Sequence, residues 1–424
     1  MNLHTYQVDF FDKASQVPSD LWEACFQPPA AGRWWYETLD QSGIEDQFIF
    51  FYALIKHLGC PVGIAPIFVI DVIVGKVLRE EFLRLFRLVG KIIPSVLRQR
   101  TLFVGSPVLD ESTVGLISHV NRRAALLALQ VALEKKADEL DVPMIVWKDF
   151  PESSTADLNW LSRQRRLFRV VSFPNTVVEF SSSRKEDYFA AMKGSWRRKL
   201  KAKLRRSKEQ VDLGADIVQR PDAKTLDDIF GLFWQTYEKS ASKFERLNRK
   251  FFEIIAEKQA TFFILLREKI TGEIIAFMLC LDMGERLMNL LIGIDYRRPK
   301  EWMLFFRLWE AVVDLALSRG FSAILSGRSS YEAKIETGHR LVWLNNYCRH
   351  RNMFLHPIYR IVAQSIGWAS LDEALARFLK AHPESGPPPD TRLSIGKFNA
   401  RAIDRFSDSR IDAPTARPKK SLIR

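Results

Sequence analysis

The order of strand-like and helix-like segments constrains the fold of this 424-residue chain more than any other feature. In each half, strands joined by tight turns are followed by a long amphipathic helical pattern and then by a further apolar strand. The first half places these elements at residues 47–56, 62–70, 102–107, 120–140 and 144–147. The second half places them at residues 261–267, 273–281, 286–294, 302–318 and 321–325. This repetition predicts an α+β (α/β) protein with two similar modules in tandem, each a mixed, largely antiparallel sheet flanked by helices.

A strongly basic segment lies between the two sets of strands. Residues 193–208 contain nine Lys or Arg side chains and no acidic one. Met192, Trp196, Leu200 and Leu204 recur every four residues, which predicts a helix docked by a narrow apolar stripe. Ser183 and Glu186 have the spacing of a capping box, so we expect the helix to cover residues 184–209. Its cationic face predicts binding to phosphates or another polyanion, with Arg197 and Arg198 among the contacts.

The net charge of +13 is confined to two parts of the chain. The basic segment supplies nine charges, and the tail from Glu384 onward has nine basic and five acidic residues. The remainder carries 45 residues of each sign and is neutral.

The repeated element order and the composition of the tail predict the domain bounds. We expect a first module at 1–165, a second at 166–365 that includes the basic helix, and a disordered basic tail at 383–424.

Several classes of protein are disfavoured by the sequence. The four cysteines form no CxxC pair, which disfavours a zinc site or a disulfide framework and favours a reducing, cytoplasmic setting. His339, His350 and His356 do not have the spacing of a metal motif, so no metal is expected. No Gly-x-Ser-x-Gly elbow is present, which argues against a serine hydrolase. Neither a signal peptide nor a transmembrane segment is visible, since Pro61, Pro66 and Asp71 interrupt the most apolar stretch.

Residues 72–97 alternate apolar and basic side chains. Two interpretations remain open for this segment: a helical cover over the first sheet, or an amphipathic helix that faces lipid. The second would place the protein peripherally at the inner face of a membrane.

One ordered set of features resembles a known family. The segment VSFPNTVVEF (171–180) is followed by the basic helix, three antiparallel strands, a helix and SGRSSYEAKIETG (326–338). This order resembles the Fem-like and CelD-like branch of the GNAT acyltransferase superfamily, whose members carry two GNAT modules in tandem. Their Gly…Tyr-x-x-Lys…Gly element corresponds here to Gly327, Tyr331, Lys334 and Gly338.

The resemblance implies transfer of an acyl group to an amine or hydroxyl. The donor would be acyl-CoA or, in the Fem-like relatives, aminoacyl-tRNA, and the acceptor a cell-envelope or polysaccharide-related molecule. Ordinary GNAT enzymes hold the CoA pyrophosphate on a glycine-containing loop, but residues 295–302 have no glycine. The sequence offers Arg297, Arg298 and Lys300 there, together with Lys334, as side-chain ligands for the phosphates.

Direct acyl transfer requires a base and a group that stabilises the oxyanion. The candidate catalytic residues are Tyr331 as a general acid and Asp295 or Glu332 as a base. We expect the active site in a cleft shared by the two modules, with Tyr331 and Lys334 on the same wall as Arg297 and Arg298. Two other hypotheses stay open: a nucleic-acid-binding protein that uses the basic helix, and a non-catalytic GNAT-fold protein associated with a polyanion or a membrane.

Overall fold

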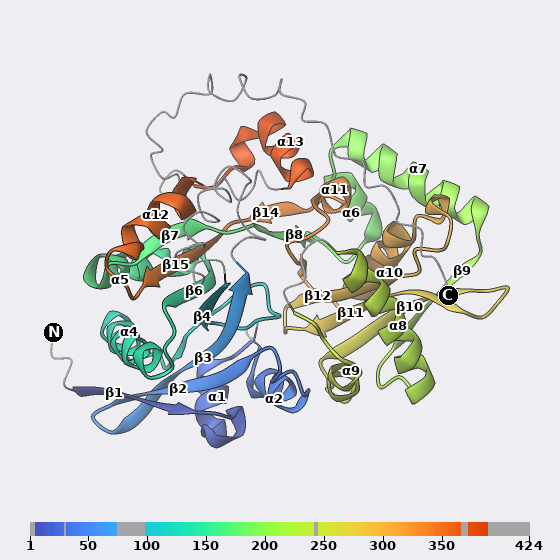
Figure 1. Ribbon diagram of the computed structural model, residues 1–424. Helices are drawn as coiled ribbons and strands as arrows, with labels where there is room; N and C mark the ends of the chain where they lie inside the picture. The colour runs from blue at the N-terminus through green and yellow to red at the C-terminus, as the bar shows by residue number, and fades with distance from the viewer. Residues whose placement is uncertain (1–4, 29–30, 74–97, 241–244, 366–371, 389–424) are drawn as a thin grey trace, which may run out of the picture. The chain divides into compact units, whose positions relative to one another are not determined.

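The computed structural model describes residues 5–28, 31–73, 98–240, 245–365 and 372–388 (Figure 1). Residues up to Pro387 form one compact unit that contains two sheets. The predicted α+β architecture, with two tandem modules built on mixed, largely antiparallel sheets, is confirmed.

Sheet A forms the first module. Its strands are antiparallel to their neighbours except for β4 and β6, which run parallel. Their order is β1 (Tyr6–Phe11), β2 (Ile49–His57), β3 (Cys60–Ile73), β4 (Arg98–Val104), β6 (Met144–Pro151), β15 (Leu344–His350) and β7 (Phe168–Val171), with β5 (Gly115–Leu116) beside β3.

Strand β2 shows how sheet A is covered. Its alternate residues Phe51 and Ala53 face a core with α4 (Arg122–Glu139) and α5 (Thr155–Arg165). Tyr52 and Leu54 face the opposite side, where α1 (Ser19–Cys25) and α2 (Arg33–Gln41) pack. The period-two alternation of a strand therefore produces two covered faces.

Sheet B forms the second module. Only β12 and β13 run parallel, and all other neighbours are antiparallel. The order is β14 (Arg340–Val342), β8 (Asn175–Glu179), β13 (Ala323–Ser326), β12 (Arg286–Ile294), β11 (Ile274–Asp282), β10 (Thr261–Glu268) and β9 (Leu213–Val218). Helices α8 (Ala223–Lys239) and α9 (Arg249–Ala256) cover one face, and α10 (Leu304–Ser318) covers the other.

One hydrophobic core joins the two modules. Trp35 of α2 meets Phe251 of α9 with ring centroids 6.3 Å apart, and both side chains are fully buried. The core continues from α1 and α2 to α8 and α9, so the modules share apolar contacts as well as the chain crossings described next.

The two sheets exchange strands. After β7 in sheet A the chain crosses to β8 in sheet B, and near Trp343 it returns to add β15 between β6 and β7. Helix α12 (Leu355–Ser365) follows β15 and packs on β7 and β15. Strands β7 and β15 therefore belong to sheet A although they lie within residues 166–365.

The basic segment forms two helices instead of one. Helix α6 (Lys185–Ala191) ends before Met192, and α7 (Gly194–Gln210) starts after Lys193. The predicted capping box is wrong: the N-cap of α6 is Arg184, and it makes no side-chain cap bond. The hydroxyl of neighbouring Ser182 instead bonds to the Asp187 carboxylate over 2.5 Å. The apolar stripe is confirmed, since Met192, Leu200 and Leu204 are buried.

Four short 3-10 helices and two further α-helices complete the described structure. They are Ala14–Gln16, Glu152–Ser154, Lys300–Trp302 and Pro383–Ser385, together with α11 (Tyr331–Glu336) and α13 (Glu373–Ala381). Within the described ranges, none of the helices is long and apolar enough to span a membrane. Residues 74–97 of the amphipathic segment and the tail from residue 389 lie outside the described residues.

Candidate active site

A cavity lies where β12 and β13 part. The two strands pair only from Arg286–Asn289 to Ala323–Ser326, after which β12 continues to Ile294 while the chain leaves β13. The opening between them holds a cavity of about 300 Å³ with mostly apolar walls. This volume falls at the lower end of the range for small-molecule sites.

A chain of hydrogen bonds crosses the floor of this cavity. Asn289 Nδ2 donates to Ser326 Oγ over 3.1 Å, and Ser326 Oγ lies 3.0 Å from His339 Nε2. His339 Nδ1 lies 2.9 Å from the carbonyl oxygen of Lys334. Because a carbonyl can only accept, Nδ1 carries the imidazole proton and Nε2 accepts the proton of the Ser326 hydroxyl.

The hydroxyl oxygen of Ser326 has one lone pair that accepts no hydrogen bond from the described residues. A serine oxygen offers one donor and two acceptor lone pairs. Its proton goes to His339, and one lone pair receives Asn289. The Sγ of Cys280 donates to Asn289 Oδ1 over 3.2 Å, which fixes the amide orientation. The second lone pair of Ser326 is therefore available to an N–H or O–H group of a molecule in the cavity.

His339 is held as a neutral imidazole. It is 3% exposed and packs against Trp309 in a tilted arrangement, with ring centroids 4.5 Å apart. Burial lowers the pKa of His339 to about 3, and the positive charge of Lys334 acts in the same direction. The proton on Nδ1 thus stays in place throughout the physiological pH range.

Lys334 is a buried ionisable group of the cavity wall. Its side chain is 7% exposed, and Nζ donates to the carbonyl oxygen of Gly327. Burial lowers the pKa of Lys334 to about 8, with the nearby Arg328 as a further cause, while Asp110 opposes the shift. The amine therefore changes its charge close to neutral pH, which is the range suited to a general base.

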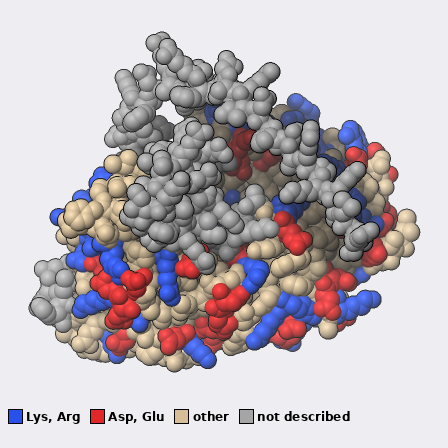
Figure 2. Space-filling view, in the orientation of Figure 1, with Lys and Arg blue, Asp and Glu red and all other residues tan. Residues whose placement is uncertain are grey.

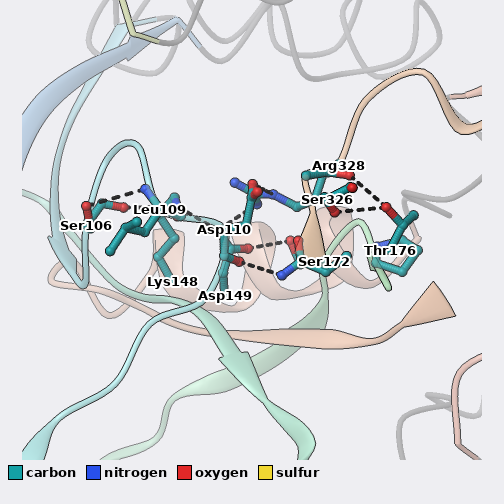
Figure 3. A network of polar contacts seen from close by, with 12 residues as sticks. Ser106, Leu109, Asp110, Lys148, Asp149, Ser172, Thr176, Ser326 and Arg328 are labelled. Atoms are coloured by element: carbon teal, nitrogen blue, oxygen red, sulfur yellow. Dashed lines mark hydrogen bonds and ion pairs between the residues drawn. The ribbon is translucent and has the colours of Figure 1, made fainter. Parts of the chain in front are cut away.

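A buried network of charges joins this site to sheet A (Figure 3). Arg328, which follows β13, donates to Asp110 over 3.2 Å and to Asp149 over 2.6 Å. Lys148 Nζ lies 2.7 Å from the Asp149 carboxylate, and Ser172 donates to the same carboxylate over 2.7 Å. Burial alone would raise the pKa of Asp149, but Arg328 and Lys148 outweigh it and hold the pKa below its usual range.

The loop after β13 also packs closely against sheet A. A Cβ atom on Gly327 would lie 2.7 Å from Asp110 Oδ2, too close for any larger residue. On the other side, Thr176 Oγ1 donates to the carbonyl oxygen of Ser326 over 2.8 Å. The loop that carries the cavity's polar groups is therefore positioned by both modules.

The chain is similar to one protein family and to several solved structures. Residues 194–334 match the family model described as an acetyltransferase (GNAT) domain. The solved structure of FemX is similar with a TM-score of 0.54 at 10% identity, covering 84% of this chain and all of that one. A tandem GNAT protein from the clavulanic acid biosynthesis pathway has a TM-score of 0.50 at 8% identity, covering 82% and 99%. No sequence match was found among curated proteins.

Residues 194–334 are therefore similar to a GNAT domain, and the chain has the fold of the tandem GNAT protein and of FemX.

The cavity lies in the second module, and all of its lining residues except His339 fall within the matched range 194–334. All of its lining residues lie between Thr236 and His339. The expected cleft shared by the two modules is therefore not where this cavity lies. The first module contributes through the charge network behind the loop.

The three candidate catalytic residues lie around the GNAT cavity without lining it. Tyr331 is 1% exposed, and its hydroxyl donates to the carbonyl oxygen of Pro174 over 2.7 Å. Asp295 accepts hydrogen bonds from Arg297 Nε at 2.8 Å and from Arg298 Nε at 3.2 Å. Glu332 points to solvent, with its side chain 73% exposed.

The predicted phosphate ligands differ in their exposure to solvent and in the number of acidic side chains that already pair with them. Arg298 is held by Glu268, Glu273 and Asp295, whereas the side chain of Arg297 is 80% exposed. Lys300 is exposed at the turn before α10. Lys334, predicted as a phosphate ligand, instead lines the cavity beside Ser326. No group of side chains in the described ranges has the arrangement of a metal site.

The cations of α7 are only partly neutralised. Lys203 pairs with Glu336, and Lys208 pairs with Glu310 over 2.9 Å. Arg197 is half-buried and reaches the carbonyl oxygen of Ala190. Four further cations are exposed and form no ion pair within the described part of the chain: Arg198, Lys199, Lys201 and Arg206.

Sequence reasoning missed Ser326, His339 and Asn289 as a functional set. Asn289 gave a usable signal, because it is a lone amide in the otherwise apolar strand RLMNLLIGI. His339 follows directly on the Tyr-x-x-Lys-x-x-x-Gly element but was considered only as a metal ligand. Its partner Ser326 lies thirteen positions earlier, and only the fold brings the two together.

Proposed function

We propose that the protein is an acyltransferase that moves an acyl group from acyl-CoA to an amine or hydroxyl of a cell-envelope or polysaccharide-related acceptor. The observation that carries this proposal is the hydrogen-bonded chain from Asn289 through Ser326 to His339, on the floor of the cavity between the parted strands. The match of residues 194–334 to a GNAT domain supports the same reaction class.

The polar groups divide the chemistry between them. For an amine acceptor, the second lone pair of Ser326 accepts one N–H and orients the nitrogen toward the thioester, which leaves another N–H proton for Lys334. A hydroxyl acceptor has a single O–H proton, and this proton goes to Lys334. The neutral amine of Lys334 takes the proton that the acceptor loses as the new C–N or C–O bond forms and the C–S bond breaks. The resulting ammonium then returns that proton to the departing thiolate, so the enzyme ends the cycle unchanged.

The donor phosphates are assigned to the turn between β12 and α10. Arg297 and Lys300 are the exposed cations of that turn, while Phe305 in the first turn of α10 lines the cavity. This arrangement would hold the polyanionic end of acyl-CoA in solvent and lead its acyl end between the strands. Arg298 and Asp295 then shape the turn through their ion pair.

Under this proposal none of the three candidate catalytic residues from the sequence touches the acyl group, and two of them position neighbouring segments. Tyr331 fixes the loop before β8 through Pro174, and Asp295 fixes the turn of Arg297. Glu332 has no role in the transfer step. A cytoplasmic setting is part of the proposal and is supported by the four cysteines, all of which are free thiols.

The test follows release of CoA thiol from acetyl-CoA with panels of amine and hydroxyl acceptors. We expect Ser326→Ala to lower kcat/KM by about a hundredfold, the typical scale for losing a positioned polar group in a transition state. Ser322→Ala, at the exposed bend directly before the same strand, is the matched control and should keep wild-type turnover. Equal activity of the wild type and Ser326→Ala would contradict the proposed site.

A second candidate donor is aminoacyl-tRNA. The observation that favours it is the row of exposed cations on α7, including Arg198 and Arg206, which suits a long polyanion better than one pyrophosphate. Thermal shifts with acetyl-CoA and with tRNA separate the two donors. Stabilisation by tRNA, lost in Arg198→Gln/Arg206→Gln, would favour the tRNA-dependent reaction. Stabilisation by neither ligand would favour a non-catalytic polyanion- or membrane-associated role.

A further inference from the structure

Helix α12 and the residues before it present an unusual apolar surface. The described residues include nine large apolar side chains classed as exposed, and four of them fall within residues 353–361. Met353 is 73% exposed, Phe354 76%, Ile358 47% and Ile361 68%. The other five lie on separate strands or turns. Single exposed apolar residues are ordinary, but a contiguous group on one element marks an interaction surface.

The spacing places this group on one face of the helix. Ile358 and Ile361 are three residues apart within α12, and Phe354, in the turn just before the helix, lies four residues ahead of Ile358 and continues the same stripe. The opposite face of α12 is buried, because Tyr359 and Val362 pack with Phe168 of β7. The helix therefore cannot turn its exposed apolar stripe inward without losing its contact with sheet A.

An exposed cation lies on the same helix as the stripe. No Asp or Glu occurs between Thr337 and Leu371. Of the arginines in this stretch, three pair with acids of other elements: Arg340 with Glu179, Arg349 with Glu134, and Arg351 with Asp141. Arg360 is exposed and forms no ion pair within the described part of the chain. Burial lowers the pKa of His356 in α12, and the charges of Arg349 and Arg360 add to this effect.

We propose that residues 353–361 dock the protein on an anionic lipid bilayer, with Phe354, Ile358 and Ile361 entering the interface and Arg360 meeting the headgroups. An amphipathic helix with an apolar stripe and basic flanks is the arrangement that binds at such an interface. Neither an apolar protein partner nor a free anion accounts for both features, because the first needs no cations and the second no apolar stripe. The proposal is independent of the transfer chemistry, since binding is measured without substrates.

The experiment is co-sedimentation of the full chain with unilamellar vesicles of phosphatidylcholine alone or mixed with phosphatidylglycerol. We expect binding to the mixed vesicles and little to the neutral ones. Phe354→Ser and Ile361→Ser should each weaken the partition coefficient by about tenfold, the scale expected for one large apolar side chain. Ile270→Ser is the matched control, because Ile270 is 89% exposed in the turn between β10 and β11, and its binding should equal that of the wild type.

A charge variant separates α12 from the other basic surfaces. Arg360→Glu should weaken binding to the mixed vesicles, whereas Lys269→Glu, at another exposed site, should not. Three outcomes would overturn the proposal. They are no binding to the mixed vesicles, binding that Phe354→Ser and Ile361→Ser leave unchanged, and a wild-type dimer in solution that these two variants dissociate.

Discussion

The hydroxyl of Ser326 donates to Nε2 of His339 over 3.0 Å, and this single bond fixes the roles of both side chains. The histidine is kept in one tautomer by the Lys334 carbonyl on its other nitrogen. The serine hydroxyl can therefore accept one more hydrogen bond, but it cannot donate another. The pair orients a substrate that donates a hydrogen bond, as an amine or alcohol does, in preference to one that only accepts.

The burial of His339 predicts a measurable sensitivity to acid. Its pKa is about 3 in the folded chain and about 6.5 when unfolded, so between these values the unfolded state binds the extra proton. Stability therefore falls as the pH falls through this window, by about 2 kcal/mol at pH 5 relative to pH 7.5. Urea denaturation of the wild type and His339→Phe at both pH values measures this. The variant should lack this part of the pH dependence, and an identical dependence in the two proteins would show that His339 is not buried as described.

The amine of Lys334 predicts a rising pH–rate profile. With a pKa of about 8, the neutral amine becomes the major form above that pH. If this amine is the base, kcat should rise through about pH 8 and then level off. Lys334→Arg separates this role from a phosphate contact, because arginine keeps the positive charge but cannot act as a base. We expect Lys334→Arg to lose kcat, with Lys269→Met as the control for an exposed lysine. Retained kcat would support the phosphate role instead.

The same lysine predicts a gain in stability when it is removed. Because the folded pKa of about 8 lies below the unfolded value of about 10.4, folding disfavours the charged form below pH 8. Replacing Lys334 with Met should therefore raise the free energy of unfolding at pH 7, by up to about 3 kcal/mol. This gain should shrink as the pH rises from 8 toward 10.4, and it should vanish above 10.4, where the amine is neutral in both states. Thermal denaturation at pH 7 and pH 10 tests the sign of the effect.

The charge network between the modules predicts a large loss of stability in Asp149→Asn. This change leaves Arg328 and Lys148 buried beside a neutral amide, and breaking such a buried pair costs about 3–5 kcal/mol. Glu179→Gln is the matched control, since its ion pair with Arg340 is exposed and should be worth at most about 1 kcal/mol. Denaturant unfolding measures both variants. Similar small losses in the two would mean that the network does not stabilise the fold.

The close approach of Gly327 to Asp110 predicts that the loop tolerates no side chain. Gly327→Ala would place Cβ 2.7 Å from a carboxylate oxygen, so the loop or Asp110 must move. We expect a destabilisation of about 1–3 kcal/mol, as for other overpacked sites. Turnover should fall with it, because Ser326 precedes the shifted residue. Gly272→Ala is unsuitable as a control because of its positive φ, but Gly214→Ala meets no atom within 4 Å and should be close to neutral in both measurements.

Much of the fold could be predicted from the sequence because its elements are local. The three strands of the second-half meander were expected at 261–267, 273–281 and 286–294, and they form β10, β11 and β12 within two residues of those limits. Tight turns and apolar periodicity specify such segments directly. The break between α6 and α7 was missed, because Lys193 adopts an extended conformation that the basic composition does not reveal.

The candidate site was only partly predictable, because its residues are brought together by long-range packing. Asn289 and Ser326 are 37 positions apart and meet only because β12 and β13 run parallel. Lys334 was singled out from its motif, but its burial depends on the way α11 turns toward the cavity. Arg328 pairs with Asp110, 218 positions away in the other module, and no local pattern indicates that contact.

The return of β15 to sheet A has a consequence for how the chain is made. Strands β6 and β7 leave the ribosome early. Strand β15, which lies between them in the sheet, is residues 344–350 and is translated much later. Until then each of them presents an open edge that can pair with a wrong partner. The first sheet can therefore be completed only after every strand of the second sheet has been synthesised, although most of its own strands come first in the chain.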